Sequence, residues 1–276
     1  MTTIRLKRVL VTGAARGIGK AVARRFAAAG AEVVITDLDA AALEAARDDV
    51  AGARENGAGA ICRAYPLDVA DADAVHAVRD RLHAEAGRID VLVNNAGVVH
   101  GGAFLEVPLE RHRATYRVNV EGVMTMTHAF LPDLIAAPRG HLVNLASASG
   151  FIGLPNGATY ASSKWAVIGF SESIRLELRS QGHKNVDVTT VCPTYVDTGM
   201  FEGARPPRTT RVLTPDLLAA KIVEAVEQRK VWVLEPWIVK ITPMLKSCLP
   251  TPVSDFLSDA LGASSSMDNW RGHDAR

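Results

Sequence analysis

The chain contains 276 residues, of which 48% are hydrophobic and 22% are charged, a composition that predicts one large domain with a substantial core. Its formal net charge of +1 argues against a broad basic surface for nucleic acid, and no run of about 18 apolar residues predicts a transmembrane helix. Three widely separated cysteines, histidines without metal-ligand spacing and a start without a signal-peptide core predict a cytoplasmic protein with no disulfide and no metal.

Short β-branched runs alternate with amphipathic helical segments along most of the chain. Strands are predicted near residues 8–12, 32–36, 60–65, 90–94, 141–146, 186–192 and 231–234. Helices are predicted over residues 17–29, 40–51, 71–86, 109–136, 158–181 and 215–228. This alternation predicts the α/β class, with a single domain built on a doubly wound parallel sheet of about seven strands and helices on both faces.

The first predicted strand leads directly into a glycine-rich turn. The strand Val9–Thr12 is followed by Gly13-Ala14-Ala15-Arg16-Gly17-Ile18-Gly19, and then by a helical stretch closed by Gly30. Glycines between a strand and a helix allow a tight turn, a close approach of the backbone to a pyrophosphate and close helix–strand packing. We therefore predict a Rossmann-type dinucleotide site with contacts from Gly13, Arg16, Gly17, Ile18 and Gly19.

Tyr160 and Lys164 lie one helical turn apart, and Ser147 precedes them in the chain. A nearby cation favours tyrosinate over tyrosine, so Lys164 is expected to lower the pKa of Tyr160 and make it a useful base near neutral pH. A serine hydroxyl close by can hold the oxygen of an alcohol or a carbonyl. The three residues together predict proton transfer to or from a substrate oxygen.

The glycine spacing G-x-x-x-G-x-G, with Thr12 ahead of it and the three catalytic candidates behind it, resembles the short-chain dehydrogenase/reductase family. Further motifs match that family in the right order, over roughly residues 5 to 236. They comprise Asp68-Val69 for the adenine, Asn95-Ala96-Gly97 within N-N-A-G, the helix residue Asn119, and Pro193, Val196 and Thr198 in the segment over the nicotinamide.

This resemblance implies a catalytic tetrad of Asn119, Ser147, Tyr160 and Lys164. It also implies that Lys164 binds the nicotinamide ribose and that Asn119 holds a water linking Lys164 to solvent. One position departs from the family pattern, because Thr194 follows Pro193 where glycine is usual. Threonine lacks the backbone freedom of glycine, so this loop is expected to be shaped differently beside the nicotinamide.

Two residues point to different cofactors. Asp37 ends the second strand, where a carboxylate can hold the adenosine ribose hydroxyls. Arg16 lies where family members that prefer NADP often carry a basic residue, but it can equally cover the adenine, pair with Asp37 or sit at a solvated helix start. A carboxylate about 4 Å from a phosphate would repel it by roughly 4 kcal/mol at an effective dielectric constant near 20. NAD is therefore the predicted cofactor, and NADP is the alternative.

The resemblance implies an NAD-dependent oxidoreductase that interconverts an alcohol and its carbonyl by hydride transfer, with Tyr160 as acid and base. The stretch Cys192–Phe201 and the tail are similar to the branch that contains retinol dehydrogenases and certain hydroxysteroid dehydrogenases. That branch implies a lipophilic primary or secondary alcohol of retinoid, steroid or long-chain type. The alternatives are an NADPH-dependent reductase of oxoacyl or small carbonyl compounds and a non-catalytic NAD(H)-binding regulator, which would not need the tetrad.

Residues 1–236 are expected to form the dinucleotide-binding and catalytic domain, and 237–276 a C-terminal apolar extension. A Pro- and Arg-rich segment at about 199–213 is predicted to be a mobile substrate lid. Its residues Met200 and Phe201 are expected to contact the substrate, as are Ser147 and Tyr160, with Met244 and Leu245 of the extension meeting them. The apolar face of the extension can line the pocket, touch a membrane surface or pack on a subunit.

Family members commonly pair two long helices across a two-fold axis, which here correspond to residues 109–136 and 158–181. A homodimer or homotetramer is therefore predicted. The apolar candidates for this contact, some of which must face the sheet instead, are Phe130, Leu134, Trp165, Phe170 and Leu176.

Overall fold

The computed structural model of the protein describes residues 4–53, 60–207 and 210–272. Its strands are β1 (Arg8–Thr12), β2 (Glu32–Asp37), β3 (Cys62–Pro66), β4 (Val91–Asn94), β5 (Gly140–Leu145), β6 (Val186–Pro193) and β7 (Trp232–Glu235). Its helices are α1 (Gly17–Ala28), α2 (Ala40–Ala51), α3 (Ala72–Glu85), α4 (Leu109–Tyr116), the π-helix η1 (Arg117–Glu121), α5 (Gly122–Ala136), the 3-10 helix η2 (Ala148–Gly150), α6 (Ala158–Ser180), α7 (Pro215–Gln228), α8 (Ile238–Cys248) and α9 (Thr251–Leu261). The predicted α/β fold is confirmed.

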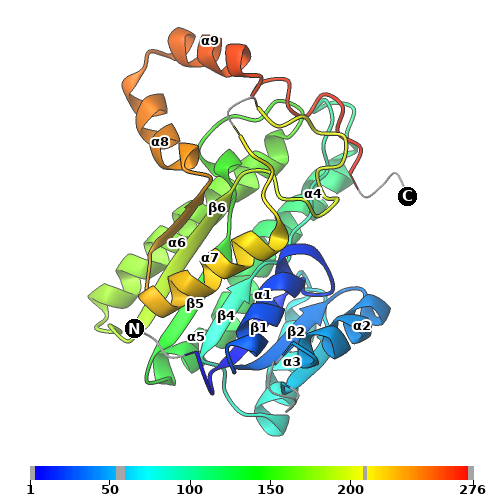
Figure 1. Ribbon diagram of the computed structural model, residues 1–276, viewed down its shortest axis with the longest axis vertical. Coiled ribbons are helices and arrows are strands. Elements are labelled where there is room, and N and C mark those ends of the chain that lie inside the picture. Colours follow the sequence, from blue (N-terminus) through cyan, green and yellow to red (C-terminus); the bar gives the residue numbers. More distant parts are fainter. Residues whose placement is uncertain (1–3, 54–59, 208–209, 273–276) are drawn as a thin grey trace.

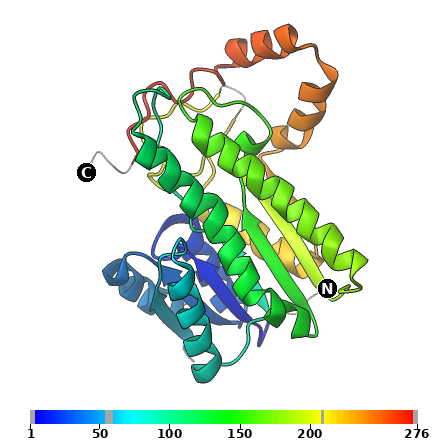
Figure 2. The ribbon, with the colours of Figure 1, turned by 180° about the vertical axis from the view of Figure 1, so that it is seen from behind.

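All seven strands run parallel in one sheet, in the order β3-β2-β1-β4-β5-β6-β7. Helices α1, α2 and α7 cover one face, and α3, α5 and α6 cover the other (Figures 1 and 2). Successive side chains of β1 point to opposite faces of the sheet: Val9 and Val11 pack with the first helical layer, and Leu10 packs with the second. The strand order reverses between β1 and β4, so a crevice opens there at the carboxyl ends of the strands.

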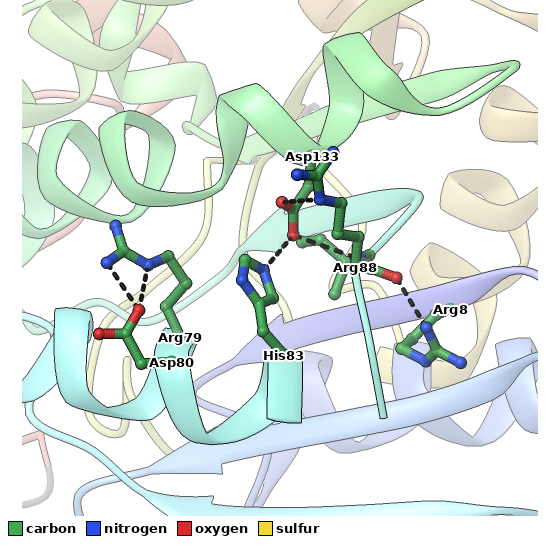
Figure 3. Close-up of polar contacts among 7 residues, drawn as sticks. Arg8, Arg79, Asp80, His83, Arg88 and Asp133 are labelled. Atoms are coloured by element: carbon green, nitrogen blue, oxygen red, sulfur yellow. Dashed lines mark hydrogen bonds and ion pairs between the residues drawn. The ribbon is translucent and has the colours of Figure 1, made fainter. Parts of the chain in front are cut away.

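A buried carboxylate connects several elements near the amino end of β4, at the opposite end of the strand from the crevice. Asp133 of α5 is 3% exposed, and its Oδ2 lies 2.7 Å from Nε2 of His83 on α3. The same oxygen accepts a hydrogen bond from the backbone amide of Ile89, just before β4 (Figure 3). Arg88 Nε lies 3.9 Å from the other carboxylate oxygen. These contacts tie α3, α5 and the start of β4 together, which leaves the functional residues at the far ends of the strands.

The helix predicted over 109–136 is interrupted in the structure. Residues Arg117–Glu121 form the π-helix η1 between α4 and α5. A single π turn inserts one extra residue into the helical register, and such turns gather at functional sites. The predicted site residue Asn119 lies within it.

Two of the apolar residues predicted for a subunit contact belong to the core instead. Phe130 and Leu134 are fully buried because α5 turns their side chains toward the sheet. By contrast, Leu176 and Trp165 on α6 are about half exposed, at 52% and 46%. Phe170 is partly buried against a cluster near α8.

Helices α8 and α9 project beyond the carboxyl ends of the strands (Figure 1). Val239 is the single buried residue of α8, and α9 has none. Within the described ranges, no helix combines the length and the apolar character needed to cross a bilayer.

Candidate active site

The turn after β1 is locked to the end of β4. Thr12 Oγ1 accepts hydrogen bonds from the amides of Asn95 and Ala96, both at 3.0 Å. Asn95 Nδ2 in turn donates to the carbonyl of Gly13 at 2.9 Å. Gly13 has φ +63°, and a Cβ there would lie 2.8 Å from Cα of Ala96. A Cβ on Gly19 would lie 2.2 Å from the carbonyl oxygen of Gly13, so both positions require glycine.

A groove of about 490 Å³ follows the carboxyl ends of the strands from this turn. The sequence-predicted cofactor residues that line it are Gly13, Arg16, Gly17, Ile18, Asp37, Asp68, Val69, Asn95, Ala96, Gly97, Tyr160, Lys164, Pro193, Val196 and Thr198. Gly19 does not line the groove, because its role is the close packing described above. The groove is long and open at the start of α1, which is where a helix N-terminus can receive a phosphate. In the described part of the chain, no cluster of three His, Cys, Asp or Glu side chains gathers to hold a metal ion.

Asp37 and Arg16 both line the groove, but they do not pair with each other. The Asp37 carboxylate accepts hydrogen bonds from the amides of Ala15 at 2.9 Å and Asp39 at 3.2 Å. Arg16 Nη2 lies 2.9 Å from Oδ2 of Asp39. The pairing of Arg16 with Asp37, one of the alternatives open from the sequence, is therefore not found. The Arg16 guanidinium is ion-paired with Asp39. Asp37 lines the groove, and two backbone amides hold its carboxylate.

Ser147, Tyr160 and Lys164 meet at the inner end of the groove, as predicted. Ser147 follows β5, and Tyr160 lies in the first turn of α6, close enough for the serine hydroxyl to act on the pKa of the tyrosine. Lys164 Nζ donates to the carbonyl of Leu145 at 2.8 Å and lies 5.6 Å from the centroid of the Tyr160 ring. All three side chains are buried, so their polar groups act in a medium of low dielectric constant.

Burial dominates the charge states of these residues. It raises the pKa of Tyr160 to about 12, and the hydrogen bond with Ser147 lowers that pKa only in part. Burial also lowers the pKa of Lys164 to about 8. The expectation that Lys164 depresses the tyrosine pKa is not met in this state of the molecule, since tyrosinate and ammonium both lose hydration and Nζ is bound to a carbonyl. Tyr160 is therefore protonated at neutral pH.

Asn119 holds the π-helix against the loop after β4. Its Oδ1 accepts from the amide of Val98 at 2.8 Å, and its Nδ2 donates to the carbonyl of the same residue at 2.9 Å. Nδ2 also lies 3.0 Å from Oγ of Ser163, the neighbour of Lys164. A Cβ on Gly97 would lie 3.2 Å from Asn119 Oδ1 and 3.6 Å from Lys164 Nζ, so glycine keeps the space between them free. The water predicted to link Asn119 and Lys164 remains a prediction.

The predicted lid residues Met200 and Phe201 do line the groove, but their partner is a different segment from the one predicted. Both pack with Tyr160 and with Met267, which is 2% exposed, in one apolar cluster. Trp270 Nε1 donates to the carbonyl of Met200 at 3.0 Å. Met244, by contrast, is 60% exposed, because α8 turns it outward. Part of the predicted lid, residues 208–209, lies outside the described residues.

An apolar cavity of about 220 Å³ joins the groove at its catalytic end. Its inner wall includes Ser147 and Tyr160, and its outer wall is formed by α8, α9 and the segment after them. Leu245 lines it as predicted, together with Leu257 of α9. The extension therefore contributes to a pocket wall rather than serving only as a surface appendage.

Residues 7–209 match the short chain dehydrogenase family. The chain belongs to that family. Epidermal retinol dehydrogenase 2 from Homo sapiens is 36% identical to it over 264 residues, which cover 95% of this chain and 84% of the human protein. A short-chain dehydrogenase/reductase from Burkholderia phymatum in complex with NAD aligns with a TM-score of 0.80 at 28% identity, covering 90% of this chain and 95% of that one. A metagenomic short-chain oxidoreductase in complex with NADP aligns with a TM-score of 0.70 at 32% identity, covering 84% and 96%.

As a short-chain dehydrogenase, the protein is an NAD(P)-dependent oxidoreductase acting on alcohols, and it resembles the retinol dehydrogenase branch of the family. The structure adds site residues that the sequence analysis missed. Asp39 lines the groove two residues after Asp37, and this closeness to a predicted residue was its one signal in the sequence. Met267 and Trp270 carry no motif at all. Only the fold brings them to the active site of this short-chain dehydrogenase.

Proposed function

We propose that this protein is an NAD-dependent dehydrogenase that interconverts a lipophilic alcohol and its carbonyl compound. One observation carries the proposal: Ser147 and Tyr160 line both the dinucleotide groove and the apolar cavity, at the point where the two spaces meet. A substrate whose body fills the cavity would present its oxygen to both hydroxyls. The carbon next to that oxygen would then face the groove.

In the proposed reaction the chain holds the substrate oxygen and moves its proton. Ser147 and Tyr160 bind the oxygen, and Tyr160 takes the hydroxyl proton during oxidation or gives it back during reduction. A bound nicotinamide supplies or accepts the hydride. The residues present fit that group, because the glycine turn, Asp37 and the segment from Pro193 to Thr198 line one continuous groove. Lys164, buried beside Tyr160, is placed to hold the ribose and to favour tyrosinate once Nζ leaves the Leu145 carbonyl.

The preference for NAD rests on Asp37. Its carboxylate lines the adenosine end of the groove, and the nearby guanidinium of Arg16 is engaged by Asp39. A phosphate on the ribose would meet the Asp37 carboxylate there, at a cost of roughly 4 kcal/mol for two charges about 4 Å apart at an effective dielectric constant near 20. Relatives of known structure hold either NAD or NADP, so the local charges decide the proposal.

The lipophilic substrate is inferred from the cavity and from the relatives. The cavity is walled by aliphatic side chains of α8 and α9, such as Leu245 and Leu257, and Lys246 is its one charged lining residue among those described. The similar human protein is named a retinol dehydrogenase. An elongated apolar alcohol fits both findings better than an oxoacyl or other small carbonyl compound does.

The cytoplasmic location and a membrane contact by the extension both stay predictions. The three cysteines are unpaired, which is compatible with that location.

Substitution of Tyr160 by phenylalanine tests the proposal. The variant keeps the ring and loses the transferable proton, so kcat for a long-chain alcohol with NAD is expected to fall by about a hundredfold or more, read as NADH absorbance. Binding of NADH, followed by its fluorescence, should persist. Retention of most of the activity would show that Tyr160 is not the acid and base. A wild-type protein that turns over carbonyl compounds with NADPH alone would favour the alternative reductase, and one that binds NADH without turnover would favour a regulator.

We also propose a homodimer in which α4, α5 and α6 form the contact. These helices lie side by side on one face of the molecule (Figure 2). Their exposed apolar side chains include Met124 on α5 at 44% and Leu176 on α6 at 52%. Apolar area of this kind on a flat helical layer supports a two-fold contact.

A further inference from the structure

Two residues that line the apolar cavity carry covered hydroxyl groups for which the described part of the chain offers no hydrogen-bond partner. Ser149, on η2, is 8% exposed, and Thr194 follows β6. In each case the side-chain oxygen is buried and unpaired, whereas the backbone amide is engaged, Ser149 with Ser147 Oγ and Thr194 with the carbonyl of Glu235. Buried polar groups without a partner are rare in folded proteins, so each of these two calls for an explanation.

The other hydroxyls of the wall do not behave in this way. Four other hydroxyl groups of the wall each donate to a backbone carbonyl in their own helix or turn, at 2.7 to 3.0 Å. They belong to Thr210, Thr242, Ser258 and Ser266. Among the wall residues that the structure describes, the buried side-chain oxygens without a partner are those of Ser149 and Thr194, at the catalytic end of the cavity.

Both unpaired hydroxyls flank the hydroxyl that holds the reacting oxygen. Ser147 Oγ accepts from the amide of Ser149 at 3.2 Å and lies 3.5 Å from the carbonyl of Pro193, the residue before Thr194. Thr194 also belongs to the small set of residues that line both groove and cavity, together with Ser147, Tyr160 and Phe201. A group bound by Ser149 and Thr194 would thus lie close to the carbon that reacts.

We propose that Ser149 and Thr194 form a second polar subsite, which binds an uncharged oxygen of the substrate near the reacting carbon. The inference rests on the proposed function and narrows its substrate class to hydroxy ketones, diols and related compounds with an apolar body. The two oxygens are covered in this state of the molecule, and a rotation about χ1 would bring them to the cavity. Hydroxyl groups both donate and accept, so they would then suit a second hydroxyl or a carbonyl oxygen. A charged group is disfavoured, because the one cationic side chain of the wall, Lys246, lies over the ring of Trp165, 4.4 Å from its centroid.

Kinetics on a matched pair of ketones test the subsite. Methyl octyl ketone and its α-hydroxy derivative are reduced with NADH, and the ratio of their kcat/KM values is compared among variants. Thr194→Val keeps the shape and removes the hydroxyl, and Ser149→Ala does the same at the other position. Each is expected to lower the hydroxy-to-plain ratio by about fivefold to tenfold, the usual worth of one such hydrogen bond. Thr194→Ser, which restores a hydroxyl, should return the ratio toward that of the wild type.

The control is Thr242→Val, which removes a satisfied hydroxyl from the same cavity and should affect both ketones alike. A ratio that stays constant in Thr194→Val and Ser149→Ala overturns the subsite, and would mean that water satisfies these hydroxyls. Binding gives an independent reading: in Tyr160→Phe with NADH, protein fluorescence should show tighter binding of the hydroxy ketone, and equal affinity overturns the subsite. If the wild type turns over no retinoid, steroid or long-chain alcohol or ketone with NAD(H) or NADP(H), the proposed function fails, and this binding comparison alone decides the subsite.

Discussion

The proposed catalytic residues Tyr160 and Lys164 show how strongly burial acts on single residues in this protein. Both lie within hydrogen-bonding surroundings, yet desolvation moves the pKa of Tyr160 up to about 12 and that of Lys164 down to about 8. Both shifts go toward the neutral form, but a pKa of about 8 leaves Lys164 mostly protonated at pH 7, whereas Tyr160 is neutral. The positive charge of an oxidised nicotinamide near Tyr160 would favour tyrosinate further.

We propose that one side chain, Asp37, also decides the choice of cofactor. Replacing Asp37 by serine removes the carboxylate proposed to face the ribose and keeps a hydroxyl for hydrogen bonding. We expect the ratio of kcat/KM for NAD to that for NADP to fall by at least about tenfold, because the repulsion of a phosphate is relieved. The matched control is Asp68→Ser, another carboxylate that lines the groove. A cofactor ratio that stays the same in Asp37→Ser would mean that Asp37 does not face the ribose.

A buried histidine makes the stability of the fold sensitive to acid. His141 on β5 is 2% exposed, and its Nε2 lies 2.7 Å from Oγ1 of Thr189, whose own proton goes to the carbonyl of Lys230. Burial, followed by the charge of Arg229, lowers the pKa of His141 from 6.5 to about 3. Between these values the unfolded chain binds the additional proton, so the free energy of unfolding is fully retained above pH 6.5 and declines as the pH falls toward 3.

Urea unfolding at pH 7 and pH 5 measures this effect. The contribution of His141 should be a loss of roughly 2 kcal/mol between the two conditions. In His141→Gln, which keeps a neutral donor at the same place, most of that pH dependence should disappear. The exposed His128→Gln is the matched control and should leave it unchanged. If His141→Gln loses as much stability on acidification as the wild type does, this histidine is not the source.

Among the elements, the segment after α9 has a role that its sequence does not reveal. Residues 263–272 cross over the lid, where Met267 packs with Tyr160 and Trp270 donates to the Met200 carbonyl. The backbone of Arg205 also donates to the carbonyl of Ser266 at 2.8 Å. These contacts join the far end of the chain to the segment beside the catalytic tyrosine.

Replacing Trp270 by alanine should weaken the contact between residues 263–272 and the segment around Met200. The change removes the hydrogen bond to Met200 and much of the apolar cover beside Gly101, so KM for a long-chain alcohol is expected to rise by roughly tenfold with a smaller change in kcat. Steady-state kinetics together with thermal unfolding separates this effect from misfolding. Trp237→Ala is the control, since Trp237 is 65% exposed on the outer side of α8. An unchanged KM in Trp270→Ala would confine the segment to a packing role.

At the scale of the whole molecule, the helical layer of α4, α5 and α6 is the proposed contact between two copies. A charge placed in the centre of such a contact would be desolvated, so Met124→Glu and Leu176→Glu should each shift a dimer toward monomer in sedimentation velocity at micromolar concentration. Leu217→Glu is the matched control, because Leu217 is 45% exposed on α7, which covers the opposite face. A wild-type protein that sediments as a monomer would refute the proposed dimer.

The sequence by itself determined the parallel sheet, the glycine turn and the grouping of Ser147, Tyr160 and Lys164. These features are local: strand and helix periodicity, and motifs whose residues lie a turn apart or at the ends of neighbouring strands. What only the tertiary structure decided depends on contacts between distant segments. Tertiary packing buries Phe130 and Leu134 in the core, pairs Arg16 with Asp39 instead of Asp37, and packs Met267 against Tyr160. Burial, which sets the pKa of Tyr160, is likewise a property of the packed molecule, because it depends on every segment that excludes water from the site.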